Sequence, residues 1–413
     1  MATFYTDISG VEKNFYELYG EKSPEGQIER YEKCFSAFKS YYGENGGYIA
    51  SSSGRVEICG NHTDHNGGKA VVAAVSLDTL AFFVPTNDSV ITVYSEGYGE
   101  LTVDTQGDFS CDAGTSKSLV CGICKAFLNN GLTIGGFKAY ISSNVLSGSG
   151  VSSSASFELL ICEILNFLYN GGKVSATDKA KFSQYAENVC FGKPCGLLDQ
   201  TAISFGGLKM LDFERKNDVS VTDVKGDLSD YTLVLINTGG SHADLTDEYA
   251  AIPREMKEIA EIFGKERLIE VPEKDFIDAL KKGKINVSDR AISRAIHFYE
   301  ENERVKVCKK ALENGDYDSF LKAIKESGIS SICKLQNCYV QGRTEQPVLK
   351  ALFITSKYLN GGSNRVHGGG FAGTILNIVK NDTAKEFIKT CKEFYKEENV
   401  IPLKIRSVGT KVL

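Results

Sequence analysis

The sequence has no run of basic residues, no repeat of fixed period and no low-complexity linker. Acidic residues outnumber basic ones, 53 to 47, and the formal net charge of −6 gives no reason to expect nucleic-acid binding. Residues 1–15 contain neither a basic n-region nor an apolar h-region, so we expect no secretory signal. The longest uncharged stretch, residues 139–157, is dominated by serine and glycine and would be a poor membrane span. These absences predict a cytoplasmic protein that binds neither nucleic acid nor membranes.

Proline is scarce, at 7 residues, whereas the 41 glycines indicate many tight turns or sites lined by backbone. The 12 cysteines are scattered over a long chain, several of them in apolar runs, so we expect reduced thiols rather than disulfides. The one CxxC pair, Cys121 and Cys124, has no second pair and no neighbouring histidine to complete a zinc site. We interpret it as two buried thiols on one face of a helix.

Apolar residues make up 42% of the chain and charged residues 24%, as in an ordinary globular protein. A chain of 413 residues is too long to fold around a single compact core, so we expect about two domains. Apolar spacing predicts helices over residues 11–42, 117–129, 157–169 and 177–191. Residues 69–77 form an apolar run that is typical of a strand covered on both faces, with further strands at 79–84 and 89–95. Because strands and helices do not alternate regularly, we predict two α+β domains, residues 1–208 and 209–413.

The strongest local signal is Leu146-Ser-Gly-Ser-Gly-Val-Ser-Ser-Ser-Ala-Ser156, between a predicted strand and an apolar helix. Gly148 and Gly150 allow the backbone to approach a ligand closely. The serines lie where the helix begins, so free N–H groups and the positive end of the helix dipole face outward. The segment suits an anion such as phosphate, although it lacks the Gly-Lys-Ser/Thr of the Walker loop. A flexible linker or a serine-capped helix would have a similar composition.

Residues 54–68, Gly-Arg-Val-Glu-Ile-Cys-Gly-Asn-His-Thr-Asp-His-Asn-Gly-Gly, crowd polar side chains into a turn between two apolar strands. Their donors and acceptors would suit the several hydroxyls of a sugar. Zinc binding by His62, Asp64 and His65 and plain turn chemistry are equally open. Two further features are ambiguous alone: a glycine-rich hairpin at residues 367–373, and Asp199, which follows a turn containing proline.

Taken together, in this order and spacing, these segments resemble the GHMP kinases, and within them the galactokinases. Residues 54–68 are similar to the galactokinase sugar signature, SGSGVSSSAS to the ATP loop and GKPCGLLDQ to the segment with the catalytic aspartate. NTGGSHADLTDEY is similar to the stretch with a sugar-contacting tyrosine, and HGGGFAG to the third family motif. The resemblance spans residues 13–413. It implies the two-domain α+β fold of that family, an active site in the cleft between the domains, and transfer of the ATP γ-phosphoryl group to the C1 hydroxyl of a hexose, with galactose as the first choice.

The resemblance also implies roles for single residues. Asp199 is the catalytic carboxylate beside the C1 hydroxyl, as a general base or as a group that orients the nucleophile, and Arg55 keeps it ionised and neutralises developing charge. The implied sugar contacts are Arg55, Asn61, His62, Asp64, Gly196, Asp199 and Tyr249. The implied phosphate cradle is Gly148, Ser149, Gly150, Ser152, Ser153 and Ser154. Ser154 and Glu187 are the implied ligands of Mg²⁺.

One residue departs from the galactokinase signature, which carries Glu-His-Thr-Asp-Tyr where this chain has Asn61-His-Thr-Asp-His65. The resemblance places the missing glutamate near the C6 hydroxyl of the sugar. Asparagine both donates and accepts, so it fits a hydroxyl, and it also tolerates a C6 carboxylate that a glutamate would repel. Galacturonate is therefore an alternative substrate to galactose.

Two other classes of function stay open. Galactokinase-like sugar sensors bind sugar and nucleotide without catalysis, although Ser154, Glu187 and Asp199 are all present here. A family member that acts on a mevalonate-type alcohol would not need the polar turn at residues 61–65. We expect a monomer that binds ATP, Mg²⁺ and a small-molecule sugar. Because the chain has no tryptophan, the adenine would stack on a tyrosine or phenylalanine that the sequence does not identify.

Overall fold

The computed structural model describes residues 2–145, 148, 150–216, 218–240 and 245–413. The chain forms two compact units: unit 1 comprises Met1–Arg55, Ala73–Gly207 and Ile405–Leu413, and unit 2 comprises Val56–Val72 and Leu208–Lys404. The change from Gly207 to Leu208 falls beside the predicted boundary, but the prediction is wrong for residues 56–72 and 405–413. The physical reason is that the long strands β1 (Tyr48–Cys59) and β2 (Lys69–Pro85) each contribute residues to both units.

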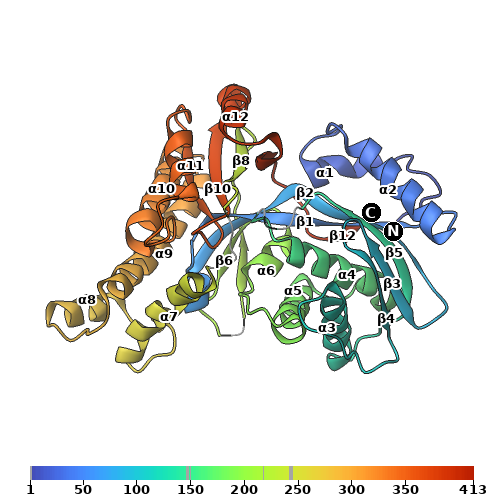
Figure 1. The fold of residues 1–413 in the computed structure, drawn as a ribbon, viewed down its shortest axis with the longest axis horizontal. Coiled ribbons are helices and arrows are strands. Elements are labelled where there is room, and N and C mark those ends of the chain that lie inside the picture. Colours follow the sequence, from blue (N-terminus) through green and yellow to red (C-terminus); the bar gives the residue numbers. More distant parts are fainter. Residues whose placement is uncertain (1, 146–147, 149, 217, 241–244) are drawn as a thin grey trace. The chain divides into compact units, whose positions relative to one another are not determined.

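Unit 1 is a mixed sheet with helices on both faces (Figure 1). The strands run in the order β12, β1, β2, β5, β3, β4, and β3 pairs with β5 in parallel. The other strands are β3 (Val90–Ser95), β4 (Gly99–Asp104), β5 (Phe137–Ser143) and β12 (Lys411–Val412). The helices are α1 (Phe15–Tyr19), α2 (Gln27–Tyr42), α3 (Ser116–Asn129), α4 (Ser153–Asn170), α5 (Ala176–Tyr185) and α6 (Leu198–Phe205), with short turns η1 (Val11–Asn14) and η3 (Ala186–Phe191).

Strand β2 shows how the two faces are filled. Leu80, Phe82 and Val84 pack with α1 and α2, whereas Ala81 and Phe83 pack with α3, α4 and α5, as the period of two in a strand requires. Residues 70–75 are all 0% exposed, which confirms the prediction of a strand covered on both faces. The predicted break after residue 77 is wrong, because the one carboxylate there, Asp78, is buried and paired instead of forming a turn.

Two predicted helices are in fact divided. The helix expected over residues 11–42 is η1, α1 and α2, because Gly20 and Gly26 adopt left-handed backbone angles, with φ of 74° and 73°, between the pieces. The helix expected over residues 177–191 is α5 followed by the wider turn η3. This division places Glu187 in a π-type turn, a feature that is frequent at functional sites.

Unit 2 contains an antiparallel sheet in the order β11, β8, β10, β9 and a β6–β7 hairpin whose β6 pairs with β2. Its strands are β6 (Leu208–Asp212), β7 (Ser220–Asp223), β8 (Tyr231–Asn237), β9 (Ser363–His367), β10 (Thr374–Lys380) and β11 (Val400–Leu403). Its helices are α7 (Thr246–Ile262), α8 (Glu273–Lys281), α9 (Asp289–Glu313), α10 (Tyr317–Ser330), α11 (Pro347–Ser356) and α12 (Asn381–Phe394). Its short turns are η2 (Asp64–Asn66), η4 (Leu268–Glu270), η5 (Ser331–Leu335) and η6 (Glu397–Asn399).

Unit 2 has two hydrophobic clusters. In one, α11 and α12 pack with the sheet, and in the other α7, α8 and α9 pack together. Both units therefore mix helices and sheet, in agreement with the predicted α+β class. All twelve cysteines are free thiols. Among the residues that the structure describes, none of the helices has the length and apolar character needed to cross a membrane.

A buried ionic network holds the C-terminal segment in unit 1. Asp78, which is fully buried, accepts from Arg30 Nη1 at 2.6 Å, Tyr19 OH at 3.0 Å and Ser51 Oγ at 2.5 Å, and Arg406 Nη1 lies 3.8 Å away. Burial acts to raise the pKa of Asp78, but the two arginines outweigh it and hold the pKa below the usual value. The charge of Asp78 is therefore what allows the fully buried Arg406 to anchor residues 405–413.

We predict that Asp78→Asn destabilises the protein by about 3 kcal/mol, because it leaves the buried guanidinium of Arg406 without a counter-charge. The free energy of unfolding from urea titration, followed by circular dichroism, measures this effect. Lys257→Gln removes an exposed ion pair with Glu261 and serves as the control, with an expected change within about 0.5 kcal/mol. Equal stability of the Asp78→Asn variant and the wild type would refute the anchoring role.

Candidate active site

The serine-rich loop of unit 1 leads into α4, which has 18 residues. Gly148 and Gly150 adopt positive φ values of 76° and 78°, and Ser152 precedes the helix with a φ of 63°. The Ser152 side chain does not cap the helix, because its hydroxyl donates to Asp199 Oδ2 instead. The first N–H groups of α4 consequently have no side-chain cap and suit an anion, at the place where the sequence predicts the phosphate cradle. Ser149 of that cradle lies outside the described residues.

Arg55 and Asp199 form a bidentate ion pair in unit 1. Arg55, the last residue of unit 1 on β1, donates from Nε and Nη2 to Asp199 Oδ1 and Oδ2, each at 2.7 Å. Arg55 Nη1 also donates to the carbonyl oxygen of Gly150 in the serine-rich loop. The arginine is nearly buried and the aspartate side chain is 33% exposed, so a charge-assisted pair holds the carboxylate as an acceptor that still faces outward.

The carboxylate of Glu187 accepts hydrogen bonds from three parts of unit 1. Its Oε1 accepts from Ser154 Oγ of α4 at 3.1 Å and from Lys193 Nζ at 3.0 Å, and its Oε2 accepts from Gln200 Nε2 of α6 at 2.9 Å. The structure thus brings together Ser154 and Glu187, the two residues predicted to bind a cation.

Glu158 adds an unusual buried acid one turn after Ser154 on α4. The side chain is 0% exposed, and neither carboxylate oxygen has a hydrogen-bond partner among the described residues. Oε1 of Gln200 is buried and unpartnered in the same way. Burial raises the pKa of Glu158 well above its usual value, and the charge of Glu187 raises it further.

Residues 56–68 of the sugar signature lie in unit 2, whereas Gly54 and Arg55 belong to unit 1. His62 has a φ of 57°, and its ring lies 5.2 Å from that of Tyr249 on α7. Because the carbonyl oxygen of Gly369 can only accept, its 2.9 Å contact with His62 Nε2 places the proton on Nε2 and leaves Nδ1 as an acceptor. Burial lowers the pKa of His62 to about 3, so this neutral form holds at neutral pH.

Asp64 begins the short turn η2, and its carboxylate lies 3.7 Å from His65 Nε2. The glycine-rich hairpin at residues 367–373 joins β9 to β10, as predicted. A Cβ at Gly369 would lie 2.1 Å from Cε2 of Tyr249, so only glycine lets the tyrosine approach the hairpin. The structure brings His62, Tyr249 and Gly369 together in unit 2. No group of three or more potential metal ligands occurs among the described residues, so the zinc alternative finds no support.

The structure gives Asn61 a role that the sequence did not predict. Asn61 is 0% exposed, and its Nδ2 donates to Glu57 Oε1 at 3.1 Å and to the carbonyl oxygen of Gly368 at 2.9 Å. Its Oδ1 accepts from Asn337 Nδ2 at 2.8 Å and from Ser331 Oγ at 3.4 Å. These bonds use the full capacity of an amide side chain, so the geometry favours a positioning role over direct contact with a sugar.

Sequence reasoning missed the residues of α9 that hold this turn. Glu301 accepts from the N–H groups of Gly60 and Asn61, at 2.9 and 3.3 Å, and His297 Nε2 donates to the carbonyl oxygen of Asn61 at 3.0 Å. Asn302 Oδ1 accepts from the N–H of Lys69 at 2.7 Å. The spacing of His297 and Glu301, which places both on one helix face, was the only available signal.

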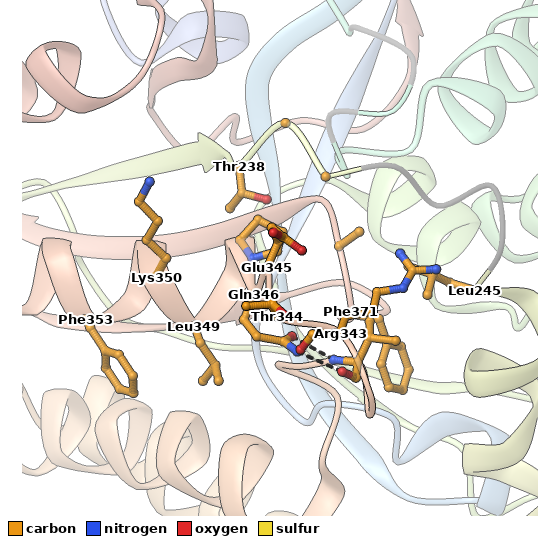
Figure 2. Close-up of a pocket in the computed structure, with 15 residues that line it drawn as sticks. Thr238, Leu245, Arg343, Thr344, Glu345, Gln346, Leu349, Lys350, Phe353 and Phe371 are labelled. Atoms are coloured by element: carbon orange, nitrogen blue, oxygen red, sulfur yellow. Dashed lines mark hydrogen bonds between the residues drawn. The ribbon is translucent and has the colours of Figure 1, made fainter.

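Unit 2 also has a pocket of about 750 Å³ that contains none of the predicted site residues (Figure 2). It is lined by residues that follow β8, by the residue before α7, by α11 and by the β9–β10 hairpin, including Thr238, Leu245, Leu349 and Phe371. Figure 2 shows Gln346 hydrogen-bonded to the backbone beside Arg343, with Phe353 and Lys350 further along α11.

Gly196, a predicted sugar contact, lies in unit 1, in the loop that precedes α6, and α6 contains Asp199.

Comparison with known proteins defines the class. Residues 118–207, which include the serine-rich loop and Asp199, match the family described as GHMP kinases N terminal domain. The fold agrees with this class, since the mevalonate kinase of Methanococcus jannaschii superposes with a TM-score of 0.62 at 16% identity, covering 87% of this chain and 98% of that one.

The particular family follows from closer matches. Residues 36–85 match the galactokinase galactose-binding signature. The galactokinase of Clostridium acetobutylicum is 30% identical over 379 residues, which cover 89% of this chain and 93% of that protein. The structure of Lactococcus lactis galactokinase complexed with galactose has a TM-score of 0.78 at 25% identity, covering 92% of this chain and 98% of that one. The chain belongs to the galactokinase family of GHMP kinases.

The role of Asn61 can be tested by Asn61→Asp, which replaces the amide donor by an oxygen facing Glu57 and the carbonyl of Gly368. We expect a loss of about 2–4 kcal/mol in the free energy of unfolding, because two acceptors then face a third without a proton donor. Urea titration measures this loss, and Asn45→Asp, at an exposed position between α2 and β1, is the control. A variant with unchanged stability but an altered KM for sugar would favour the direct contact expected from the sequence.

A second prediction concerns pH. The folded-state pKa of His62, about 3, lies below the ordinary value of 6.5, so the unfolded chain binds a proton that the folded chain does not. The resulting stability is present above pH 6.5 and is lost as the pH falls towards 3; between pH 7 and 5 the loss is about 2 kcal/mol. In His62→Gln the free energy of unfolding should therefore fall less over this range than in the wild type. Parallel profiles for the two proteins would contradict the prediction.

Proposed function

We propose that this protein transfers the γ-phosphoryl group of ATP to the C1 hydroxyl of galactose. The observation that carries the proposal is the Arg55–Asp199 ion pair beside the uncapped start of α4, which combines a proton acceptor, a positive charge and an anion site in unit 1. Membership of the galactokinase family supports galactose as the acceptor, and the relative from Lactococcus lactis is described as complexed with galactose.

In this proposal Asp199 orients the C1 hydroxyl and accepts its proton. Phosphoryl transfer depends chiefly on positioning and charge neutralisation, so a carboxylate fixed by two arginine nitrogens suits the task. The N–H groups of α4 and the hydroxyls of Ser152, Ser153 and Ser154 bind the phosphates. His62, through its Nδ1 lone pair, Asp64 and Tyr249 bind sugar hydroxyls.

The donor set of unit 1 fits a divalent cation. Ser154 Oγ and Glu187 Oε1 would hold it, and the buried Oε1 of Gln200, which has no hydrogen-bond partner among the described residues, adds a further oxygen on a side chain that contacts Glu187. Hard oxygen ligands of this kind suit Mg²⁺, which when bound would neutralise phosphate charge. We also propose that the protein is a monomer and that it is cytoplasmic; the twelve free thiols favour a reducing compartment of this kind.

The test is ADP release from ATP and Mg²⁺ with a panel of hexoses and uronic acids. We expect galactose to support turnover and galacturonate not to, since Asn61 has no unused hydrogen-bonding capacity. Asp199→Asn should lower kcat by about a hundredfold or more while the Kd for galactose changes less than about threefold, because proton acceptance is lost and hydroxyl binding is kept. Glu29→Gln, on the exposed side of α2, is the control.

Each alternative predicts a different result. Turnover with galacturonate alone would support a kinase of C6-modified sugars. Binding of sugar and ATP without ADP release would indicate a sensor. If no sugar raises the melting temperature, a non-sugar alcohol becomes the better candidate, since a ligand of the native state must stabilise it. Near-normal turnover of Asp199→Asn would disprove the role of that residue.

A further inference from the structure

Lys193 is the one cation that contacts Glu187 among the described residues. It lies in the loop between η3 and α6, where its N–H donates to the carbonyl oxygen of Glu187 at 3.0 Å. The backbone is thus fixed beside Glu187. The side chain is 62% exposed, and its ammonium reaches back to Glu187 Oε1 at 3.0 Å. A long flexible stem that is largely in solvent can change its partner at small cost.

The oxygen that Lys193 contacts is the one a metal ion would need. Ser154 and Lys193 both donate to Oε1 of Glu187, while Gln200 donates to Oε2. A carboxylate oxygen accepts about two such bonds. A cation bound jointly by Ser154 and Glu187 would compete with the ammonium of Lys193 for this oxygen, because two positive charges repel each other at such a short distance.

The burial of Glu187 explains why a lysine side chain lies beside its carboxylate. The Glu187 side chain is only 4% exposed, so its charge would be expensive to leave without a cation. Lys193 thus takes the position that a divalent cation would take when one is bound.

We propose that Lys193 binds the phosphates of ATP: its ammonium neutralises Glu187 until a divalent cation and the nucleotide arrive, and it then donates to a phosphate oxygen. Both Ser154, in the first turn of α4, and Lys193 Nζ already lie within 3.1 Å of one oxygen, so the ammonium is beside the start of the helix. Lysine is well suited to phosphate as a compact point charge. The inference rests on the proposed function, because it takes its phosphates from ATP.

The experiment is isothermal titration calorimetry of two ligands separately: ATP in the presence of EDTA, and Mg²⁺ without nucleotide. Lys193→Gln should bind metal-free ATP about tenfold more weakly, a loss of about 1.4 kcal/mol. The same variant should bind Mg²⁺ severalfold more tightly, because no ammonium competes for Glu187. Lys193→Arg should restore ATP binding, and Lys33→Gln, on the exposed side of α2, should match the wild type.

Opposite changes in the two affinities would support the proposal, together with a KM for ATP raised about tenfold and a kcat changed less than threefold. Equal ATP affinity in Lys193→Gln and the wild type would overturn it. A parallel loss of the affinities for ATP and for Mg²⁺ would also overturn it, since the lysine would then serve only to keep the Glu187 side chain in its position. If the wild type binds ATP and Mg²⁺ but releases no ADP with any sugar, the proposed function fails while the role of Lys193 is still decided by the titrations.

Discussion

The arrangement of unit 1 depends on the ion pair between Arg55 and Asp199. One guanidinium spans both oxygens of the carboxylate and also holds the carbonyl oxygen of Gly150, so a single side chain joins β1, the serine-rich loop and α6. Since Ser152 donates to the same carboxylate, it does not cap α4, and the helix N-terminus stays open. The geometry of the anion site is thus a consequence of how one charge is satisfied.

Buried charge organises unit 2 in a comparable way. Burial acts to raise the pKa of Glu301, but His297, Arg304 and Arg365 together lower it to about 2, so the residue is a fixed anion at neutral pH. That anion accepts the N–H groups of the turn that presents His62. A loop whose backbone groups are bonded to a helix loses little further entropy when it binds a ligand, which favours affinity. The positions of the signature residues therefore depend on a helix more than 200 positions away in the chain.

Much of the architecture could be predicted, because local patterns carry it. Apolar runs located β2, and the serine-rich segment located the start of α4, since periodicity and helix caps depend on neighbouring residues. The resemblance named Asp199, Arg55, Ser154 and Glu187, and the structure brings them into two hydrogen-bonded pairs. The division of the helix at residues 11–42 was missed, because it rests on backbone angles at Gly20 and Gly26 that the apolar pattern does not report.

The sequence by itself determined the class of fold, the order of the motifs and which residue types are available for phosphate and sugar chemistry. Tertiary structure alone decided what each side chain does with its hydrogen bonds. Asn61 looks like a free polar residue in a turn, yet partners from β1, η5 and the β9–β10 hairpin saturate it. Glu158 looks like one exposed charge on an amphipathic helix, yet its side chain is fully buried beside Glu187, whose charge helps to raise its pKa. The physical reason is that burial and hydrogen-bond satisfaction depend on groups far apart in the chain, and these meet only on folding.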